Sequence, residues 1–310
     1  VLIVGTDEEA VAVHSVLESG IPKFSVAGLY DPASHLFSDT ELCDLVRRLG
    51  VREVIVAARD HRGGTVPMGQ LLECRISGIS VIDLAGFYER ERGQVPVQSL
   101  KSSWLVYGKG FAQDPVRTAV KRVFDVAGAL GLLALAAPVM LLAAAAIALE
   151  SGRPILYRQE RVGRGGRPIM CVKFRSMRAD AESDGVPRWA SKGDPRVTRV
   201  GRLLRKTRID ELPQLLNVLR GEMSLVGPRP ERPSFVKQLG ASIPYYDVRH
   251  SVKPGVTGWA QVRYTYGASV EDATRKLQYD LYYVKNHSLF LDVLILVETV
   301  RVVLFGEGAH

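Results

Sequence analysis

The sequence predicts an α/β chain in two parts, and three observations carry that prediction. Short runs of β-branched residues alternate with helical patterns over the first hundred residues. Residues 126–149 then contain no charged side chain. The charge also changes sign, because residues 1–100 hold 9 basic and 14 acidic side chains while the remainder holds 32 and 19. With 310 residues, 46% of them hydrophobic, the chain is long enough for two hydrophobic cores.

The alternation in residues 1–100 predicts a parallel β-sheet with connecting helices. Strands that alternate with helices favour βαβ units, in which the strands lie parallel. We therefore expect a Rossmann-like accessory domain over 1–100. Strand-like runs fall at 1–4, 24–29, 54–58 and 79–82, and helical patterns at 8–18, 42–49 and 68–76.

The turn after the first strand argues against a nucleotide site in this part. A dinucleotide-binding turn reads G-x-G-x-x-G, because its second glycine lets the backbone approach the pyrophosphate. This chain has Gly5 followed by Thr6, Asp7, Glu8 and Glu9. Acidic residues at a helix N-terminus satisfy the helix dipole and repel an anion. An accessory or regulatory module is the better prediction.

Residues 101–120 are expected to form a linker, and residues 123–150 a membrane helix. The uncharged core, 126–149, would extend about 36 Å as a straight helix, enough to cross a hydrocarbon layer of about 30 Å. Pro138 lies near its middle and basic residues flank both ends, whereas spanning helices carry their basic residues mainly on the cytoplasmic side. A spanning helix and a re-entrant helix bent at Pro138 both stay open. A buried helix of a soluble domain is disfavoured, because it would need protein on every side.

The last apolar segment, 289–305, carries Asp292, Glu298 and Arg301, which argue against a second span. It is expected to lie at a membrane surface or to pack in the core. Three separated cysteines without C-x-x-C spacing exclude a disulfide framework and indicate a reducing cytoplasm. The chain begins at Val1 and not at Met, as expected for a piece of a longer protein.

The basic excess of the second part indicates an anionic partner. An anionic membrane leaflet or a phosphorylated substrate would be attracted to it. Nucleic acid is the alternative, but the chain has no helix-turn-helix, zinc-finger or RNA-recognition pattern. The basic residues also follow a membrane segment, so we expect no nucleic-acid partner.

The densest polar cluster surrounds Asp210 and Glu211. Asp is among the preferred N-caps, and Asp210 can cap a helix that runs through Leu219. Arg205 and Arg208 lie directly upstream, and such cations would keep a carboxylate ionised while attracting phosphate. An ionised aspartate beside a phosphoryl group is a potential nucleophile. Taken alone, an acidic pair at a helix start favours the cap, and the two upstream arginines add weight to the nucleophile.

Arg229 and Lys173 are two further candidates for contacts with phosphate oxygens. Arg229 lies between Pro228 and Pro230, so we expect it to project from a stiff extended turn. Its guanidinium fork matches phosphate oxygens, although an ordinary surface arginine would fit the same pattern. Lys173 ends a strand-like run and either points into a site or edges the strand.

Aromatic stretches near the C-terminus complete the candidates. Trp259 in a turn-rich loop would stack on a base or lie at an interface. Further along, Asp280 joins Tyr282 and Tyr283 as a candidate, but an aromatic cluster at helical spacing is more typical of a core. No Ser-His-Asp order, H-E-x-x-H or phosphate-binding P-loop occurs, and the six histidines are scattered, so neither a histidine base nor a histidine metal site is supported.

Six motifs in their order closely resemble the bacterial sugar transferases, which are monotopic polyprenyl-phosphate phosphoglycosyl transferases. The resemblance covers about residues 117–306, and six ordered motifs are far more specific than any one of them. The first part resembles the Rossmann-like domain of larger members, which usually also carry N-terminal membrane helices. The motifs are Lys121-Arg122-Val123-Phe124-Asp125, Tyr157-Arg158-Gln159-Glu160-Arg161-Val162-Gly163, Lys173-Phe174-Arg175-Ser176-Met177, Asp210-Glu211-Leu212-Pro213-Gln214, Gly227-Pro228-Arg229-Pro230 and Pro254-Gly255-Val256-Thr257-Gly258-Trp259.

The resemblance implies a reaction and the residues for it. Asp210 matches the aspartate that attacks the β-phosphate of a UDP-sugar, releases UMP and carries the phosphosugar, which undecaprenyl phosphate then takes. Glu211 matches its acidic partner, and Mg²⁺ is the expected cofactor, held near Asp210 and the diphosphate. Lys173, Arg205 and Arg229 match cations that contact phosphate.

The resemblance also implies where the protein lies and how it is built. It predicts a mostly α (α+β) monotopic membrane catalytic domain over 121–310, with a re-entrant helix, on the cytoplasmic face of the bacterial inner membrane. The product would begin an exopolysaccharide, capsule or O-antigen. A homodimer through the first part is compatible with the sequence. A non-catalytic membrane scaffold, with the acidic pair serving only as a cap, is the alternative.

Two departures from the family pattern bear on the bend and on the substrate. Ala137-Pro138 stands where the best-known small members have Ser-Pro, so no hydroxyl satisfies the carbonyl that Pro138 frees. After Gln261, residues 262–267 replace the common Asn-Gly-Arg near the expected uridine or sugar contact. Glucose, galactose or an N-acetylhexosamine fits this pattern, with a weak preference for a hexose.

Overall fold

The chain divides into two compact units, each with its own hydrophobic clusters: Val1–Lys101 (unit 1) and Ser102–His310 (unit 2). The computed structural model describes residues 1–19, 24–32, 42–57, 66–97, 100, 110–111, 114–181, 193–264, 267 and 269–305. Most of the predicted linker, residues 101–109 with 112 and 113, lies outside this described part.

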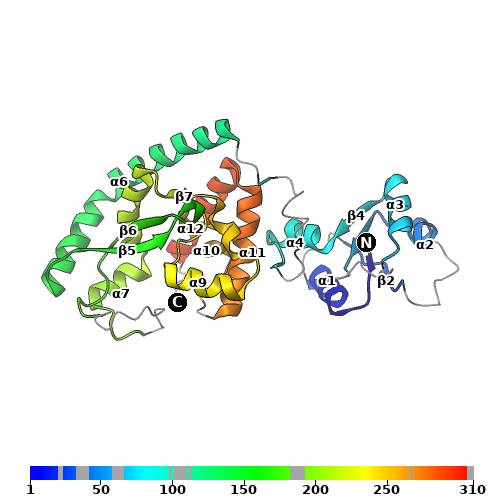
Figure 1. Cartoon of the computed structure of the whole chain (residues 1–310), viewed down its shortest axis with the longest axis horizontal. Coiled ribbons are helices and arrows are strands. Elements are labelled where there is room, and N and C mark those ends of the chain that lie inside the picture. The colour runs from blue at the N-terminus through cyan, green and yellow to red at the C-terminus, as the bar shows by residue number, and fades with distance from the viewer. Residues whose placement is uncertain are drawn as a thin grey trace. The chain divides into compact units, whose positions relative to one another are not determined.

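Unit 1 is a parallel four-stranded sheet with helices on both faces (Figure 1). Its strand order is β2-β1-β3-β4. The strands are β1 (Leu2–Val4), β2 (Gly28–Tyr30), β3 (Glu53–Val56) and β4 (Ser80–Asp83), and the helices are α1 (Glu8–Ser19), α2 (Leu42–Arg48), α3 (Met68–Ile76) and α4 (Leu84–Arg92).

Successive residues of the central strands supply the two faces of this sheet. Ile3 and Ile55 pack with residues of α1 and α4. Leu2 and Val54 point to the opposite face, which α2 and α3 cover. A sheet buried on both faces explains why its strands read as continuous apolar runs. The α/β prediction is confirmed, and the Rossmann-like classification stays a prediction.

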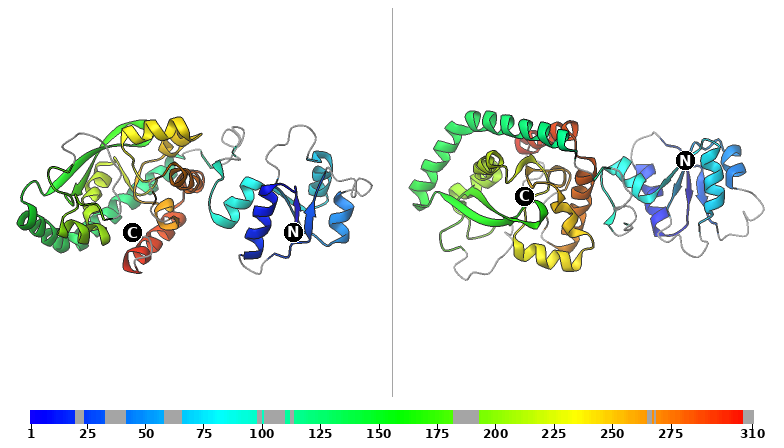
Figure 2. Two further views of the ribbon diagram at one scale, coloured as in Figure 1. Left: turned by 90° about the horizontal axis from the view of Figure 1, so that it is seen from below. Right: turned by 45° about the horizontal axis from the view of Figure 1, so that its top comes forward.

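In unit 2, helices surround a two-stranded antiparallel hairpin and a short pair of parallel strands (Figure 2). Its core joins the hairpin, the parallel pair and the last helices. The strands are β5 (Leu156–Val162) antiparallel to β6 (Pro168–Phe174), and β7 (Ser224–Val226) parallel to β8 (Gly255–Thr257). The helices are α6 (Pro115–Ser151), η3 (Arg164–Gly166), α7 (Arg199–Lys206), η4 (Ile209–Gln214), α8 (Leu215–Arg220), α9 (Pro233–Ser242), η5 (Tyr246–Ser251), α10 (Trp259–Arg263), α11 (Val270–Asn286) and α12 (Leu289–Phe305).

Helix α6 is the longest element and begins before the predicted start at residue 123. Asp114 accepts a hydrogen bond from the Val116 backbone nitrogen (3.0 Å), and Pro115 occupies the first helical turn, where no backbone donor is needed. Residues 115–120 are therefore helical, and their assignment to a linker was wrong. The helix runs through Pro138 without ending and forms an arch (Figure 1).

The middle of α6 is apolar and exposed. Leu135, Leu141 and Leu142 are each more than 70% exposed. Such a surface is unfavourable in water, and α6 is long and apolar enough to cross a membrane by length and composition. Its buried positions are Asp125 and Ala129 before Pro138 and Ala143 and Ile147 after it.

The first third of α6 is held by a buried polar network. Lys121 Nζ lies 2.8 Å from Asp125 Oδ1 and 3.0 Å from Asp292 Oδ2 of α12. Asp125 Oδ1 also accepts a hydrogen bond from Ser224 Oγ of β7 (3.0 Å). Because buried charges need partners, this network fixes α6 against β7 and α12.

The end of α6 is held by a different part of the same unit. The Glu150 carboxylate accepts hydrogen bonds from the backbone nitrogens of Arg199 and Val200 (2.9 and 3.0 Å), at the start of α7. Arg175 donates to the Ser151 carbonyl (2.7 Å) and so satisfies a free helix-end acceptor. One compact unit therefore binds both ends of the apolar helix.

Helix α12 fits the prediction for residues 289–305 of a helix with a packed face. Leu291 and Ile295 are buried in the core of unit 2. Phe290 and Val297, on another face, are 79% and 64% exposed. Contact of this exposed face with a membrane stays a prediction.

Candidate active site

Three segments of unit 2 converge on one polar centre. Strand β6 supplies Lys173, the 3₁₀ helix η4 supplies Asp210 and Glu211, and the turn after β7 supplies Arg229. These residues lie up to 56 positions apart in the sequence. Four of the five residues predicted for the site are thus brought together.

Backbone constraints explain why η4 and the Arg229 turn hold their shapes. Arg208 has a left-handed conformation (φ 58°) directly before η4 and turns the chain between α7 and η4. At Gly227, an added Cβ would lie 2.4 Å from the Lys253 carbonyl oxygen, so only glycine permits this close approach. The Arg208 turn therefore fixes the direction of η4, and the close contact at Gly227 restrains the backbone that carries Arg229.

Glu211 is the anchor of the centre. It is 6% exposed and its carboxylate receives both guanidinium ends of Arg229, at 2.5 and 3.2 Å. Lys173 Nζ lies 3.3 Å from the same carboxylate, and Arg208 lies at 3.9 Å. Burial alone would raise the pKa of Glu211, but the charges of Arg229 and Lys173 outweigh it and hold that pKa well below its ordinary value.

Asp210 directly precedes Glu211 in the chain, but within the part of the chain that the structure describes its carboxylate makes no comparable contacts with cations. It is 7% exposed, and among the described residues we find no hydrogen bond or ion pair to its carboxylate. Burial and then the negative charge of Glu211 raise the pKa of Asp210 to about 6. The carboxylate is therefore ionised at neutral pH, with its lone pairs uncommitted.

One expectation about Asp210 needs correction. It does not cap a helix, because it lies inside η4, whose first flanking residue is Arg208, and no side-chain cap bond forms there. The nearby cations act in the expected direction, towards the ionised form. Lys173, Arg229 and Arg205 do lower the pKa of Asp210, but burial and Glu211 raise it by more.

Lys173 and Arg205 are placed differently from one another. Lys173 lies near the end of β6 and its ammonium points into the centre, and burial lowers its pKa against the opposing charge of Glu211. Arg205 of α7 donates from Nε to Ser176 Oγ (3.1 Å). Its charge acts on Asp210, but the structure shows no direct contact of Arg205 with the acidic pair.

Asn217 is a supporting residue that the sequence reasoning missed. Its buried amide accepts a hydrogen bond from the Val172 backbone nitrogen (3.2 Å) and donates to the Met170 carbonyl (2.8 Å). These bonds tie α8 to β6 directly before Lys173. A polar side chain on the apolar face of a helix was the available signal, because buried amides need partners.

Arg249 and Asp280 form a second missed support behind the centre. Arg249 Nη2 lies 2.7 Å from Asp280 Oδ2 and donates to the Arg229 carbonyl oxygen (2.9 Å). Both side chains are nearly fully buried. Asp280 therefore belongs to the core, and its partner Arg249 holds the backbone of Arg229 in place.

Trp259 is not available to stack on a base. It is 6% exposed, belongs to the core of unit 2 and packs on Tyr282 with ring centroids 5.9 Å apart. Tyr283 is buried as well and donates a hydrogen bond to Asp292 (2.7 Å). The core interpretation of the two tyrosines is confirmed.

A divalent cation would find few protein ligands here. Within the described residues, no group of three or more His, Cys, Asp and Glu side chains converges. The Glu211 oxygens are engaged by cations, which leaves Asp210 as the available carboxylate. Mg²⁺ usually takes one or two carboxylates and completes its shell with water and substrate phosphates, so Asp210 fits such a mixed site but not an all-protein one.

Fold and site together define a membrane-associated α/β protein with a buried acidic pair lined by cations. The sequence profile of the bacterial sugar transferases matches residues 116–306, which is more than half of the chain. The chain belongs to this family.

The names of three similar proteins state the reactions of these relatives. A UDP-N-acetylgalactosamine-undecaprenyl-phosphate N-acetylgalactosaminephosphotransferase of Aeromonas hydrophila is 44% identical over 77% of this chain and 56% of its own length. UDP-glucose:undecaprenyl-phosphate glucose-1-phosphate transferases are 48% identical in Caulobacter vibrioides (61% of this chain, 72% of that protein) and 35% identical in Klebsiella pneumoniae (94% and 63%). The chain spans 56% to 72% of the length of these three relatives.

Proposed function

We propose that this chain transfers sugar-1-phosphate from a UDP-sugar to undecaprenyl phosphate and so begins a bacterial exopolysaccharide, capsule or O-antigen. The observation that carries the proposal is the Asp210 carboxylate, which is buried, without a partner among the described residues, and adjacent to a cation-bound Glu211. The printed names of the relatives supply the two substrate classes.

The chemistry consists of two transfers at one phosphorus atom. An Asp210 oxygen attacks the β-phosphorus of the UDP-sugar, the bond to the bridging oxygen breaks, and UMP leaves. A phosphate oxygen of the lipid then attacks the same phosphorus, and the Asp210 carboxylate leaves in its ionised form. A covalent intermediate divides one difficult displacement into two easier ones.

Surrounding cations support both transfers. Arg229 and Lys173 are fixed by Glu211, so their donors are held in position before substrate arrives. Charge accumulates on phosphate oxygens in such transition states, and preorganised cations stabilise it without reorganisation. Bound Mg²⁺, held by Asp210 and the diphosphate, would supply further neutralisation of that charge.

A re-entrant α6 would place this centre at the membrane surface. Lys121 binds the first third of α6 to the core, and Arg175 and Glu150 bind its end to α7 and β6. A helix that crosses a bilayer places its two ends on opposite sides, whereas these two ends contact one compact unit. We therefore favour entry and exit on one face. The described cysteines are free thiols, in keeping with the cytoplasmic face of the inner membrane.

The test is UMP release from membranes that contain the chain, a UDP-sugar and undecaprenyl phosphate. We expect UMP with at least one UDP-sugar, and none above background after Asp210→Asn. UMP formation that survives this substitution unchanged would remove Asp210 as the nucleophile. Absence of UMP with every UDP-sugar tried would favour the non-catalytic membrane scaffold.

A further inference from the structure

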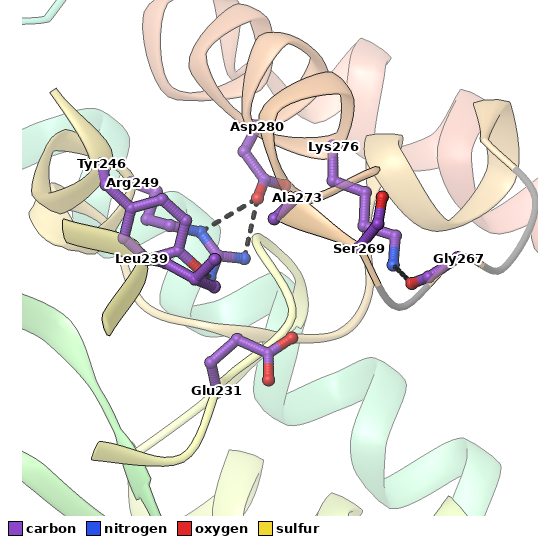
Figure 3. Close-up of a pocket in the computed structure, with 9 residues that line it drawn as sticks. All are labelled: Glu231, Leu239, Tyr246, Arg249, Gly267, Ser269, Ala273, Lys276 and Asp280. Carbon is purple, nitrogen blue, oxygen red and sulfur yellow. Dashed lines mark hydrogen bonds and ion pairs between the residues drawn. The ribbon is translucent and has the colours of Figure 1, made fainter. Parts of the chain in front are cut away.

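A small pocket lined by Glu231, Arg249, Asp280 and their neighbours is too narrow for the nucleoside of a UDP-sugar (Figure 3). Its volume is about 40 Å³, room for roughly three water molecules. Arg249 and Asp280 are bound to each other there as a buried ion pair (2.7 Å). A base attached to a diphosphate at Arg229 therefore needs a more open surface.

A row of polar side chains on β5 points to the same face of the hairpin as Lys173. Tyr157 lies directly opposite Lys173 in the antiparallel pair of β5 and β6, and directly opposite residues of such a pair share a face. Because side chains alternate along a strand, Gln159 and Arg161 lie on that face too. Lys173 reaches Glu211 from it (3.3 Å). The row therefore lies on the face of the hairpin that supplies part of the centre.

Arg161 connects this row to the turn that carries Arg229. Its Nη1 donates a hydrogen bond to the carbonyl oxygen of Pro230, the residue after Arg229 (3.2 Å). Gln159 is the diagonal neighbour of Lys173 across the hairpin, a spacing of about 7–8 Å. A group attached to a diphosphate that Lys173 and Arg229 hold can therefore reach Gln159.

Two hydrogen bonds fix the orientation of the Gln159 amide. Arg161 Nη2 donates to Gln159 Oε1, and since a guanidinium can only donate, the carbonyl oxygen must face it. Nε2 then faces the Tyr157 hydroxyl and donates to it (3.1 Å). The oxygen has two lone pairs and the nitrogen two hydrogens, so with respect to the described residues one acceptor position and one donor stay uncommitted. Gln159 is only partly buried, which leaves both accessible to a ligand.

A donor beside an acceptor in fixed order matches the edge of a uracil base. Uracil presents an N–H next to carbonyl oxygens in one plane, and glutamine amides bind base edges with such paired hydrogen bonds. The hydroxyls of a sugar rotate, so each can donate or accept and gains little from an amide of fixed orientation. Phosphate oxygens only accept, and Lys173 and Arg229 serve them better. Among the groups of a UDP-sugar, the base therefore fits this amide best.

We propose that Gln159 binds the uracil base of the UDP-sugar and makes the site selective for a uridine nucleotide. The proposal rests on the proposed function, because it assigns the base of that same substrate. The uracil N–H donates to Gln159 Oε1, and a uracil carbonyl oxygen accepts from Nε2. Cytosine has an acceptor in place of that N–H and an amino group in place of that carbonyl, so it mismatches both groups. Gln159 is thus a specificity-determining residue that takes no part in phosphoryl transfer.

Binding of UDP, CDP and inorganic pyrophosphate to the full chain in lipid nanodiscs tests the proposal. None of these probes carries a phosphosugar to transfer, so no turnover interferes. We expect the unmodified chain to bind UDP at least about tenfold more tightly than CDP. Gln159→Ala should lower this ratio to about twofold, because the match with uracil and the mismatch with cytosine disappear together. The affinity for pyrophosphate should stay unchanged, since Lys173 and Arg229 are intact.

Gln159→Glu keeps the test valid if Gln159→Ala does not fold. The carboxylate has nearly the same shape and still accepts from Arg161, but it offers no donor to a uracil carbonyl and accepts readily from the cytosine amino group. We expect this variant to bind CDP at least as tightly as UDP. Its added charge repels both nucleotides alike and cancels in the ratio. Matched controls are Gln238→Ala and Gln238→Glu, at an exposed position of α9, which should leave the ratio unchanged.

Several outcomes would overturn the assignment. An unchanged ratio in the folded Gln159 variants, or no preference for UDP in the unmodified chain, would exclude Gln159 from base recognition. A raised KM for a UDP-sugar with unchanged affinity for UDP would place the sugar at Gln159 instead. A parallel loss of pyrophosphate binding would mean that Gln159 acts on the cations and not on the base. The proposed function fails separately, by the absence of UMP release from the unmodified chain, so the two failures are distinguishable.

Discussion

Unit 1 and unit 2 each contain an acidic pair near the start of a helix, and the two pairs have different structural roles. Asp7 and Glu8 are exposed, and Asp7 Oδ1 accepts a hydrogen bond from the Ala10 backbone nitrogen (3.2 Å), which caps α1. Asp210 and Glu211 are buried, and Asp210 caps nothing. The comparison teaches that an acidic pair becomes a candidate for chemistry where distant segments bury it and bring cations to it.

The largest expected contrast is between Asp210→Asn and Asp7→Asn. We expect Asp210→Asn to lower UMP release by roughly a thousandfold or more, since removal of a covalent nucleophile has effects of that order. Asp7→Asn should leave UMP release unchanged and alter the free energy of unfolding by less than about 0.5 kcal/mol, because Asn is also a good N-cap. Kinetics and thermal unfolding of both variants are the measurements.

The free energy of unfolding of Asp210→Asn gives a second test of the environment of Asp210. The pKa of Asp210 is raised from 3.8 to about 6 in the folded chain, so its ionised form is less favourable there than in the unfolded chain. This cost is absent below about pH 4 and complete above about pH 6. Asp210→Asn should therefore stabilise the chain by about 1–3 kcal/mol at pH 7.5 and hardly at all at pH 4. A destabilised variant at pH 7.5 would contradict the buried, partnerless carboxylate.

Glu211→Gln is expected to have the next largest effect, with Glu8→Gln as its matched control. The substitution removes the carboxylate that pairs directly with Arg229 and Lys173, although both cationic side chains are partly exposed. We expect UMP release to fall about a hundredfold and the free energy of unfolding to fall by about 2–3 kcal/mol. Glu8→Gln should change neither by more than about 0.5 kcal/mol. Equal effects in the two variants would mean that Glu211 is an ordinary surface acid.

Arg229→Ala and Arg90→Ala compare two bidentate arginine pairs. Arg90 binds Glu53 in unit 1 at 2.6 and 2.8 Å, while Arg229 binds Glu211 in the centre. We expect Arg229→Ala to lower kcat/KM for UMP release about 10- to 100-fold with the chain still folded. Arg90→Ala should leave kcat/KM unchanged and lower the unfolding free energy by less than about 1 kcal/mol. Normal kinetics after Arg229→Ala would remove this residue from the site.

The pH dependence of UMP release is the smallest effect. Asp210 must be ionised to attack, and its pKa is about 6, so kcat/KM should rise with pH and be about tenfold lower at pH 5 than at pH 7.5. Glu211→Gln should move this rise to lower pH, because the negative charge of Glu211 is one cause of the raised pKa. A rise centred near pH 4 in the unmodified chain would contradict the burial of Asp210.

Local patterns predicted the elements of unit 1 and the main members of the centre. The alternation of apolar runs and helices predicted the parallel sheet. The sequence motifs identified Lys173, Asp210, Glu211 and Arg229 as candidate site residues. The sheet prediction succeeded because strand and helix patterns are local. The structure brings the four motif residues together, and their roles in a reaction stay predictions.

Long-range packing was beyond the reach of the sequence. The raised pKa of Asp210 depends on burial by segments tens of residues away, and the contact of Arg249 with Arg229 depends on the packing of η5 on α11. The helix start at Pro115 was missed because the charged first turns of α6 resemble a linker by composition. The sign of a pKa shift is therefore a result of the three-dimensional structure.

Mass spectrometry of the chain incubated with a UDP-sugar and without a lipid acceptor tests the central claim most directly. The account predicts one added hexose- or N-acetylhexosamine-phosphate on the peptide that contains Asp210, lost again when undecaprenyl phosphate is supplied. Phosphosugar on another residue, or an unmodified protein that still releases UMP when the lipid is present, would contradict it.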